Sequence, residues 1–275
     1  MKPAPFDYVR AISVADASKR LHDGAGAAVA IAGGQSLMPL LALRVAPADV
    51  LIDLLDIPAL EESHRISGGA RIGAGITHAA IEDGKIEDPT GGIMKRVAAG
   101  IAYRSVRNHG TIGGSVALAD PAADWPACLL ALGASVRVSG PSGERVAAMD
   151  EFLRGAYTTS LASGEIITAF DVPALPAGTR WSYQKVVRKS GAFAMSIGCV
   201  VLRPGEAATV VLGGTTSRAV LMPQTALAIG SDEPALRAAI AADLDDLASD
   251  ADEYQRRLHT ATLLKAIREA ADKAP

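Results

Sequence analysis

Two short glycine-rich stretches constrain the fold of this 275-residue chain more than any other feature. The first is Ala32-Gly33-Gly34-Gln35-Ser36, and the second is Thr111-Ile112-Gly113-Gly114-Ser115. Because glycine has no Cβ, it permits positive φ and lets another group approach the backbone closely. Exposed backbone N–H groups in such turns form nests that bind anions. We therefore expect the two stretches to converge on the two phosphates of a dinucleotide.

The first stretch lies between segments with opposite structural preferences. Residues 27–32 form an apolar run that is too short for a helix and predicts a buried strand. Ser36 is expected to cap a helix over residues 37–44, and residues 50–54 predict a second buried strand. A strand–turn–helix–strand unit is the common setting for a phosphate-binding turn. Taken alone, however, this turn is better explained as a simple strand-to-helix connection.

The second stretch is expected to end a loop over residues 104–115 that follows a helix over residues 89–103. Asp120 as N-cap and Pro121 in the first turn predict the start of another helix, which runs to residue 132. Two interpretations of Asp120 and Asp124 stay open. They either cap this helix only, or one of them accepts a hydrogen bond from a ribose or ribityl hydroxyl.

The second half of the chain is rich in strand signals. A Gly-Pro-Ser-Gly turn joins two strands over residues 135–139 and 144–148. The proline-rich stretch 173–178 marks the best candidate for a domain boundary. Three long strands are expected after it, followed by two helices; the ranges are 179–187, 194–202 and 207–212 for the strands, and 233–247 and 253–271 for the helices.

Composition and charge exclude several classes of function. The net charge of −3 and the pI near 6.0 provide no general attraction to nucleic acid or to an anionic membrane. No segment approaches the ~20 apolar residues that span a bilayer, and no leader peptide is recognisable. Cys128 and Cys199 lie in apolar contexts, which suits a reducing, cytoplasmic compartment. Two cysteines cannot hold an iron–sulfur cluster by themselves, so any such centre is expected on another chain.

Familiar nucleotide and catalytic motifs are missing. No Gly-x-Gly-x-x-Gly pattern follows the first strand, and no Walker lysine follows either glycine pair. The histidines are scattered without metal-ligand spacing, and there is no nucleophile elbow. An FAD scaffold of a different kind stays open. Lys185 and Phe193 flank a loop that is either an ordinary hairpin or a basic, aromatic loop facing the edge of a flavin.

Several ordered motifs resemble one family, the FAD-binding medium subunits of molybdenum hydroxylases, which include carbon monoxide dehydrogenase, quinoline oxidoreductase and the flavin domain of xanthine dehydrogenase. The resemblance spans nearly the whole chain. The motifs that carry it are Phe6-Asp7-Tyr8, Ile31 to Leu37, Val106 to Ser115, Ala119 to Asp124, Gly164 to Ile167, Lys185 to Arg188 and Leu212 to Gly214.

The resemblance implies an α+β fold with a two-lobed FAD-binding region of the vanillyl-alcohol-oxidase (PCMH-like) type. Its lobes would cover residues 1–55 and 56–176, and residues 177–275 would form an antiparallel sheet with helices. By position, two stretches would hold the FAD diphosphate, Asp124 would bind a cofactor hydroxyl, and the remaining residues would meet the isoalloxazine. The implied cofactor-binding residues are Ala32, Gly33, Gly34, Gln35, Ser36, Leu37, Ile101, Thr111, Gly113, Gly114, Ser115, Asp124, Ile167, Lys185 and Phe193.

Two positions depart from the family pattern. Gln35 stands where many members have His, and Ala192 stands where many have an acidic residue. Because a glutamine amide both donates and accepts hydrogen bonds, FAD binding is expected to survive the first change. The second change leaves the flavin-side loop less polar.

The implied function is electron transfer. The FAD would take electrons from 2Fe-2S clusters on a small subunit and pass them to an external acceptor, while a large molybdopterin subunit oxidises the substrate. The assembly would be a dimer of heterotrimers. Two alternatives stay open, a self-contained FAD-dependent reductase and a non-catalytic nucleotide-binding scaffold subunit. The reductase would need its own acid or base over the flavin, and the sequence offers no compelling candidate near Phe193.

Overall fold

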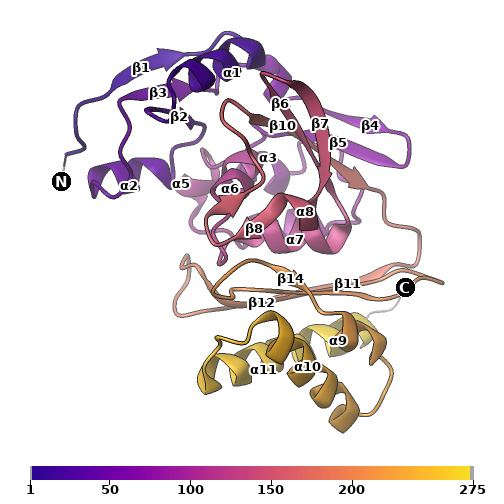
Figure 1. Ribbon diagram of the computed structural model, residues 1–275. Helices are drawn as coiled ribbons and strands as arrows, with labels where there is room; N and C mark the ends of the chain where they lie inside the picture. The colour runs from indigo at the N-terminus through magenta and orange to yellow at the C-terminus, as the bar shows by residue number, and fades with distance from the viewer. Residues whose placement is uncertain (1, 273–275) are drawn as a thin grey trace.

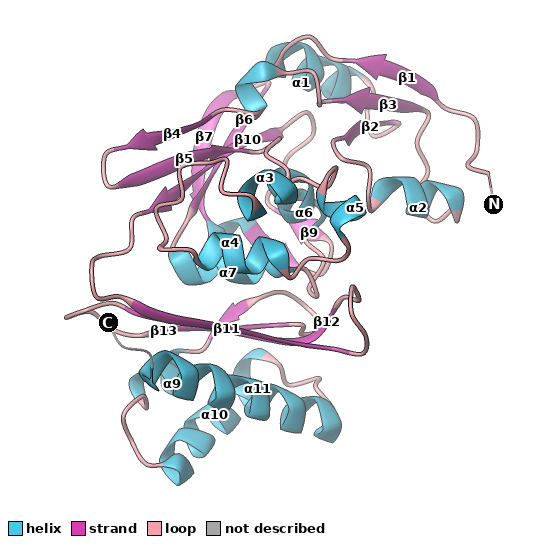
Figure 2. Ribbon diagram, turned by 180° about the vertical axis from the view of Figure 1, so that it is seen from behind, coloured by secondary structure: helices cyan, strands magenta, loops and turns pink. Residues whose placement is uncertain are grey.

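The computed structural model describes residues 2–272 and has an α+β architecture. Figures 1 and 2 show a small parallel sheet, a larger sheet with helices beneath it, a second antiparallel sheet, and a final layer of helices. The middle helices therefore lie between two sheets.

The N-terminal sheet has three parallel strands in the order β1-β3-β2. The expected strand–turn–helix–strand unit is confirmed, and β1 adds a strand that the sequence patterns did not predict. Ser13 caps the first helix by accepting a hydrogen bond from the backbone N–H of Asp16. The elements are β1 (Asp7–Arg10), α1 (Val14–Asp23), β2 (Ala28–Ile31), α2 (Leu37–Ala42) and β3 (Val50–Asp53).

The second sheet has five strands in the order β4-β5-β10-β6-β7, and each neighbouring pair is antiparallel. The expected hairpin around residues 140–143 is confirmed as β6 and β7. The strands are β4 (Ser63–Ile66), β5 (Gly69–Gly73), β6 (Ser135–Gly140), β7 (Gly143–Ala148) and β10 (Ile166–Pro173), and a 3-10 helix η1 (Pro58–Leu60) precedes them.

The helices of this region correct the expected helix over residues 89–103. Gly91 and Gly92 have φ values of 61° and 94°, which an α-helix does not contain, so α4 (Ile93–Ala99) begins after them. The other helices here are α3 (His78–Glu82), α7 (Asp124–Leu132) and α8 (Met149–Phe152). A small two-stranded sheet of β8 (Leu153–Gly155) and β9 (Thr158–Thr159) follows them.

The expected loop over residues 104–115 is also wrong. It contains α5 (Arg104–Arg107), and α6 (Ile112–Leu118) begins inside the second glycine stretch. The next helix, α7, begins at Asp124 rather than at Pro121. Asp120 does not cap it: its carboxylate accepts a hydrogen bond from Ala122 N in the preceding turn.

The C-terminal sheet is antiparallel, in the order β11-β12-β13-β14. The three long strands and both terminal helices are confirmed, whereas β14 and α9 were not expected. The elements are β11 (Arg180–Val187), β12 (Ala194–Leu202), β13 (Thr209–Gly213), β14 (Val220–Leu221), α9 (Pro223–Leu227), α10 (Glu233–Leu247) and α11 (Glu253–Asp272).

One hydrophobic core joins the two larger sheets. All nine residues of α7 are buried, and their neighbours include Phe170 of β10 and Val211 of β13. A second core on the other side of the C-terminal sheet packs β12 and β13 against α10 and α11. The expected lobe and domain boundaries at residues 55 and 176 stay predictions. Within residues 2–272, no helix is long and apolar enough to cross a membrane.

Candidate cofactor site

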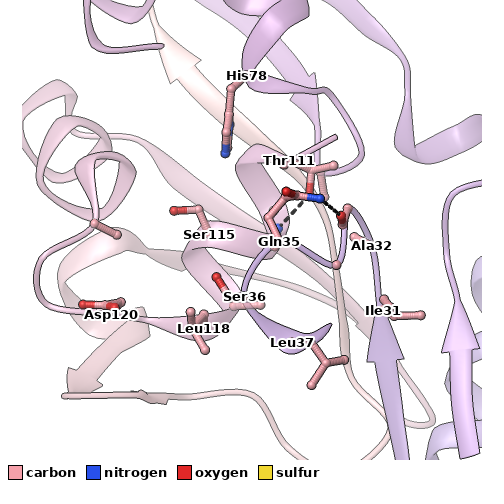
Figure 3. Close-up of a pocket in the computed structure, with 18 of the residues that line it drawn as sticks. Ile31, Ala32, Gln35, Ser36, Leu37, His78, Thr111, Ser115, Leu118 and Asp120 are labelled. Carbon is pink, nitrogen blue, oxygen red and sulfur yellow. Dashed lines mark hydrogen bonds between the residues drawn. The ribbon is translucent and has the colours of Figure 1, made fainter. Parts of the chain in front are cut away.

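A single cavity of about 620 Å³ lies where the N-terminal sheet, the middle helices and the loop between β11 and β12 meet. All fifteen residues implied by the family resemblance line it, although they come from widely separated parts of the chain. Figure 3 shows the side chains of Gln35, Ser36, Thr111 and Ser115 around part of this cavity. The structure thus brings the two glycine stretches to one site, while the role of each residue stays a prediction.

The first stretch is a turn between β2 and α2. Gly34 has φ of 68°, a left-handed conformation that favours glycine. The side chain of Gln35 donates through Nε2 to the carbonyl oxygen of Gly33 at 2.8 Å and so braces the turn. Ser36 occupies the expected N-cap position of α2, but its side chain makes no capping hydrogen bond. No hydrogen bond within residues 2–272 uses the backbone N–H groups of Gly34, Gln35 or Ser36.

The second stretch is a helix start instead of a nest of exposed N–H groups, which corrects that part of the sequence interpretation. The Thr111 hydroxyl accepts a hydrogen bond from Gly114 N at 3.0 Å. Gly113 N donates to the carbonyl of Ala74 at 2.9 Å, and Ser115 N donates to Thr111 O at 3.1 Å. These N–H groups are therefore already bonded within the protein. The second stretch instead lines the cavity with the hydroxyls of Thr111 and Ser115 and with the backbone of Gly114, which carries no side chain.

The two stretches meet at their glycines. A Cβ on Gly33 would lie only 1.9 Å from the carbonyl oxygen of His109, so only glycine fits there. A Cβ on Gly114 would lie 3.8 Å from the Cβ of Ala32. A Cβ on Gly113 would instead collide with Ala74, at 2.5 Å from its Cβ. Gly114 thus faces the first stretch, whereas Gly113 packs into the protein.

Two arginines on α5 fix the segment of chain that leads into the second stretch. Arg107 makes two hydrogen bonds to Glu82 at 2.8 and 2.9 Å, and it also donates to the carbonyl of Ile101. Arg104 makes two hydrogen bonds to Asp83, at 2.7 and 2.8 Å. Because these pairs tie α5 to the end of α3, they fix the chain just before the glycines. They also keep the pKa values of both carboxyls below their usual range, mainly through hydrogen bonds from the arginines.

A buried polar cluster forms the wall next to the C-terminal sheet. Lys185 Nζ lies 2.8 Å from Asp124 Oδ2, and the Tyr183 hydroxyl donates to Asp124 Oδ1 at 2.6 Å. Burial raises the pKa of Asp124, and the Lys185 charge opposes that rise. Each carboxylate oxygen already accepts one hydrogen bond, so a cofactor hydroxyl would have to use the remaining lone pairs. The basic character expected of this wall is compensated, because Lys185 is paired.

Aromatic and apolar residues surround the cavity opening. Phe193 is 62% exposed on the loop between β11 and β12. The Tyr103 hydroxyl donates to the carbonyl of Ser190 at 2.9 Å, and a Cβ on Gly191 would overlap the Tyr103 ring. Ile101 and Ile167 line the cavity further in. The loop is therefore held against the aromatic side chain that precedes α5.

Sequence reasoning missed His78, which it grouped with the scattered histidines. His78 lines the cavity, is 5% exposed, and accepts a hydrogen bond at Nδ1 from the indole N–H of Trp125 at 3.0 Å. Burial lowers the pKa of His78 to about 4, with Arg107 adding to the effect. The available signal was its place one residue after Thr77, the N-cap of α3, whose hydroxyl accepts a hydrogen bond from Ala80 N.

Most other titratable groups of the lining are engaged. Asp120 accepts hydrogen bonds from Ala122 N and from the Tyr157 hydroxyl, and Glu165 forms two hydrogen bonds with Arg145. Among the described residues, no group of three or more His, Cys, Asp or Glu side chains is placed to hold a metal ion.

A family model described as the FAD binding domain in molybdopterin dehydrogenase matches residues 4–175, more than half of the chain. The chain belongs to this family. A relative matched over its full length is the carbon monoxide dehydrogenase medium chain of Afipia carboxidovorans, at 33% identity over 100% of this chain and 99% of the relative. The 6-hydroxypseudooxynicotine dehydrogenase complex subunit alpha of Paenarthrobacter nicotinovorans is 38% identical over 79% of this chain and 76% of its own length.

Solved structures agree with this family membership. A chain of the reconstituted CO dehydrogenase from Oligotropha carboxidovorans superimposes with a TM-score of 0.93, at 31% identity and with full coverage of both chains. A chain of quinoline 2-oxidoreductase from Pseudomonas putida 86 gives a TM-score of 0.88, at 30% identity over 98% of each chain. The expected PCMH-like FAD-binding fold and the expected cofactor are thereby confirmed.

The residues present fit FAD. Unbonded N–H groups at Gly34, Gln35 and Ser36 are suitable donors for phosphate oxygens. The bare surface of Gly114 leaves room that a side chain would fill. Apolar and aromatic residues at the other end suit a flat ring system.

Proposed function

We propose that this chain is the FAD-carrying electron-transfer subunit of a heterotrimeric molybdenum hydroxylase. A small subunit with 2Fe-2S clusters would deliver electrons, and a large molybdopterin subunit would oxidise the substrate. The complex would be a dimer of heterotrimers, and the electrons would leave to an external acceptor. Bound FAD supplies the redox chemistry, because it accepts and releases two electrons.

The observation that carries the proposal is the cavity itself, which has an anchor for a nucleotide, while the carboxylates and the lysine among its described lining residues are already paired. Asp124 and Lys185 neutralise each other, and Glu165 is paired with Arg145. His78 is kept neutral by burial. A chain that transforms a substrate over the flavin needs a group poised for proton transfer. Electron transfer needs only that the cofactor is held and shielded, which favours this role over a self-contained reductase.

The partner subunits are inferred from the names of relatives and from the cysteines of this chain. Relatives are named as a medium chain, a medium subunit or a subunit of a complex. The two cysteines, Cys128 and Cys199, are buried, and burial raises the pKa of each thiol. Neither is suited to bind a cluster, which supports placing the iron–sulfur centres on a partner.

Two measurements test the proposal. The purified chain is expected to show absorption bands near ~370 and ~450 nm from bound flavin. Co-expressed with its neighbouring open reading frames, it is expected to co-purify with two further chains. A colourless chain that cannot be reconstituted with FAD would contradict the cofactor role. Full substrate turnover by the isolated chain would contradict the electron-transfer role.

A further inference from the structure

His78 places a hydrogen-bond donor at the junction of the two glycine stretches. The residue is 5% exposed, and its backbone N–H donates to the carbonyl of Gly110 at 2.9 Å. A Cβ on Gly110 would lie 2.8 Å from His78 Nε2. Gly110 also borders the first stretch, because a Cβ on Gly33 would lie 2.9 Å from the Gly110 Cα. The Nε2 atom is therefore close to where the two stretches meet.

Trp125 fixes which ring nitrogen carries the proton. An indole N–H can only donate, so the hydrogen bond from Trp125 Nε1 requires an unprotonated Nδ1 on His78. Because burial lowers the pKa of His78 to about 4, the ring is neutral near pH 7. The single proton of a neutral imidazole then sits on Nε2.

No hydrogen bond among residues 2–272 uses this Nε2–H, and Nε2 is not among the fully buried polar atoms that lack a partner, so it keeps some exposed surface even though His78 as a whole is 5% exposed. Figure 3 shows the nitrogen-bearing tip of the ring pointing into the cavity, toward the space flanked by Thr111 and Ser115. Because Nε2 is exposed only to the cavity side of a side chain that is otherwise buried, its hydrogen bond is open to whatever occupies the cavity. An unpaired donor that faces a cavity indicates that the partner belongs to the ligand.

We infer that His78 is a positioning residue that donates a hydrogen bond from Nε2–H to a diphosphate oxygen of FAD, with Trp125 holding the ring in the required tautomer. The inference rests on the FAD site described above and deepens it. A neutral donor adds no net charge to a cavity whose Asp124 and Lys185 already form an ion pair. It also supplements the second stretch, whose own N–H groups are used within the protein.

The first test compares ligand affinities of the full-length chain after removal of flavin. FAD and riboflavin are titrated against the wild type, His78→Leu and His78→Gln. His78→Leu is expected to weaken FAD binding about 10- to 100-fold, the effect of a hydrogen bond to a charged group, and to leave riboflavin binding unchanged. His78→Gln is expected to recover most of the FAD affinity, because its amide can donate from a similar position.

His259→Leu is the matched control. His259 is also buried at 1% exposure, with Nδ1 2.9 Å from the Ser196 hydroxyl, but it lies outside the cavity lining. It is expected to lower the melting temperature without changing FAD affinity. Equal FAD affinity in wild type and His78→Leu would overturn the inference, and so would an equal loss for riboflavin. Failure of the wild type itself to bind FAD would instead refute the FAD site.

The second test requires no variant at His78. Nitrogen-15 NMR of the wild-type chain is expected to show His78 as the Nε2–H tautomer, with its resonances shifted by FAD and not by riboflavin. Trp125→Phe, which removes the indole donor, is expected to mix the two tautomers and to weaken FAD binding several-fold. A proton on Nδ1 in the wild type would overturn the inference.

Discussion

The two glycine stretches look alike in sequence and differ in structure. At Gly34 the backbone enters the left-handed region, and the N–H groups that follow are unbonded within the described chain. At Gly114 the backbone is helical, and its N–H donates to the Thr111 hydroxyl. The first stretch can therefore supply hydrogen-bond donors, whereas the second supplies close approach and hydroxyls. Similar glycine patterns can thus meet two different requirements of one ligand.

The largest expected effect comes from pushing the two stretches apart. Gly33→Ala puts a Cβ into the backbone carbonyl of His109, which cannot move aside as a side-chain tip can. We expect FAD binding to become undetectable and the free energy of unfolding to fall by about 3 kcal/mol or more, the upper range for overpacking. Chemical denaturation and flavin titration measure the two effects. Wild-type affinity in this variant would contradict the contact between the stretches.

Within the second stretch, Gly114→Val separates cofactor binding from folding. The new side chain would project toward Ala32 across the site, so FAD affinity is expected to fall at least ~100-fold. The free energy of unfolding should fall by about 1–2 kcal/mol, because the position is helical and the new Cβ would lie 3.0 Å from Thr111 Oγ1, the hydroxyl that caps this helix. The flavin-to-protein ratio after purification measures the first effect.

Gly113→Val is the control for that variant, since its side chain would strike Ala74 instead of entering the site. It is expected to reduce thermal stability far more than Gly114→Val does. If both variants lose flavin with the same stability, the assignment of different sides to the two glycines is wrong.

Acid provides a third way to probe the second stretch, because His78 contacts Gly110 just before it. The folded-state pKa of His78 is about 4, below the unfolded value near 6.5, so the unfolded state takes up the proton first as the pH falls. Stability is therefore expected to decline from about pH 6.5 to about pH 4, by at most about 3.5 kcal/mol at ~1.4 kcal/mol per pKa unit.

His259 titrates in the same window, because burial also lowers its pKa to about 4. Urea denaturation of His259→Leu between about pH 6.5 and pH 5 removes the contribution of His259 and leaves that of His78, because the carboxyls with lowered pKa, such as Glu82 and Glu165, respond only at lower pH. A pH-independent stability in that variant would contradict a neutral, buried His78.

The smallest effect is expected for Gly34→Ala in the first stretch. A left-handed φ costs a non-glycine residue about 1 kcal/mol, and the new Cβ would lie 3.3 Å from the flexible Met38 side chain. We expect a modest loss of stability and a loss of FAD affinity below about tenfold, since the N–H donors remain. Isothermal titration compares this variant with Gly33→Ala. An equally severe loss would show that the turn conformation matters as much as the contact between stretches.

The sequence predicted the strands and the members of the cavity lining better than it predicted local geometry. Patterns of apolar residues predicted β6, β12 and the terminal helices, because buried positions of strands and helices are occupied mainly by apolar residues at regular spacing. The ordered motifs located both glycine stretches. Their different conformations were not predictable, since the pairing of residues 74–78 with 110–113 is made between distant parts of the chain.

The missed features have the same physical origin. Asp124 and Lys185 are 61 residues apart in sequence, so no local pattern showed that they would neutralise each other. The role of His78 depends on an indole donor 47 residues away. Helix starts at Ile93 and Asp124 were misplaced because glycine φ values and a local turn at Asp120 override helix propensity.

Because α7 is completely buried, the chain cannot be cut after the matched domain without exposing this helix. The family match ends at residue 175, yet α7 packs against β12 and β13, and Arg203 donates to carbonyls at the end of that helix. Severing the chain at that point would strip one side of the helix and remove Lys185 and Phe193 from the cavity. The FAD-binding region is therefore not expected to fold as an independent fragment. The C-terminal sheet that contributes Lys185 and Phe193 to the cavity also covers α7 in the hydrophobic core.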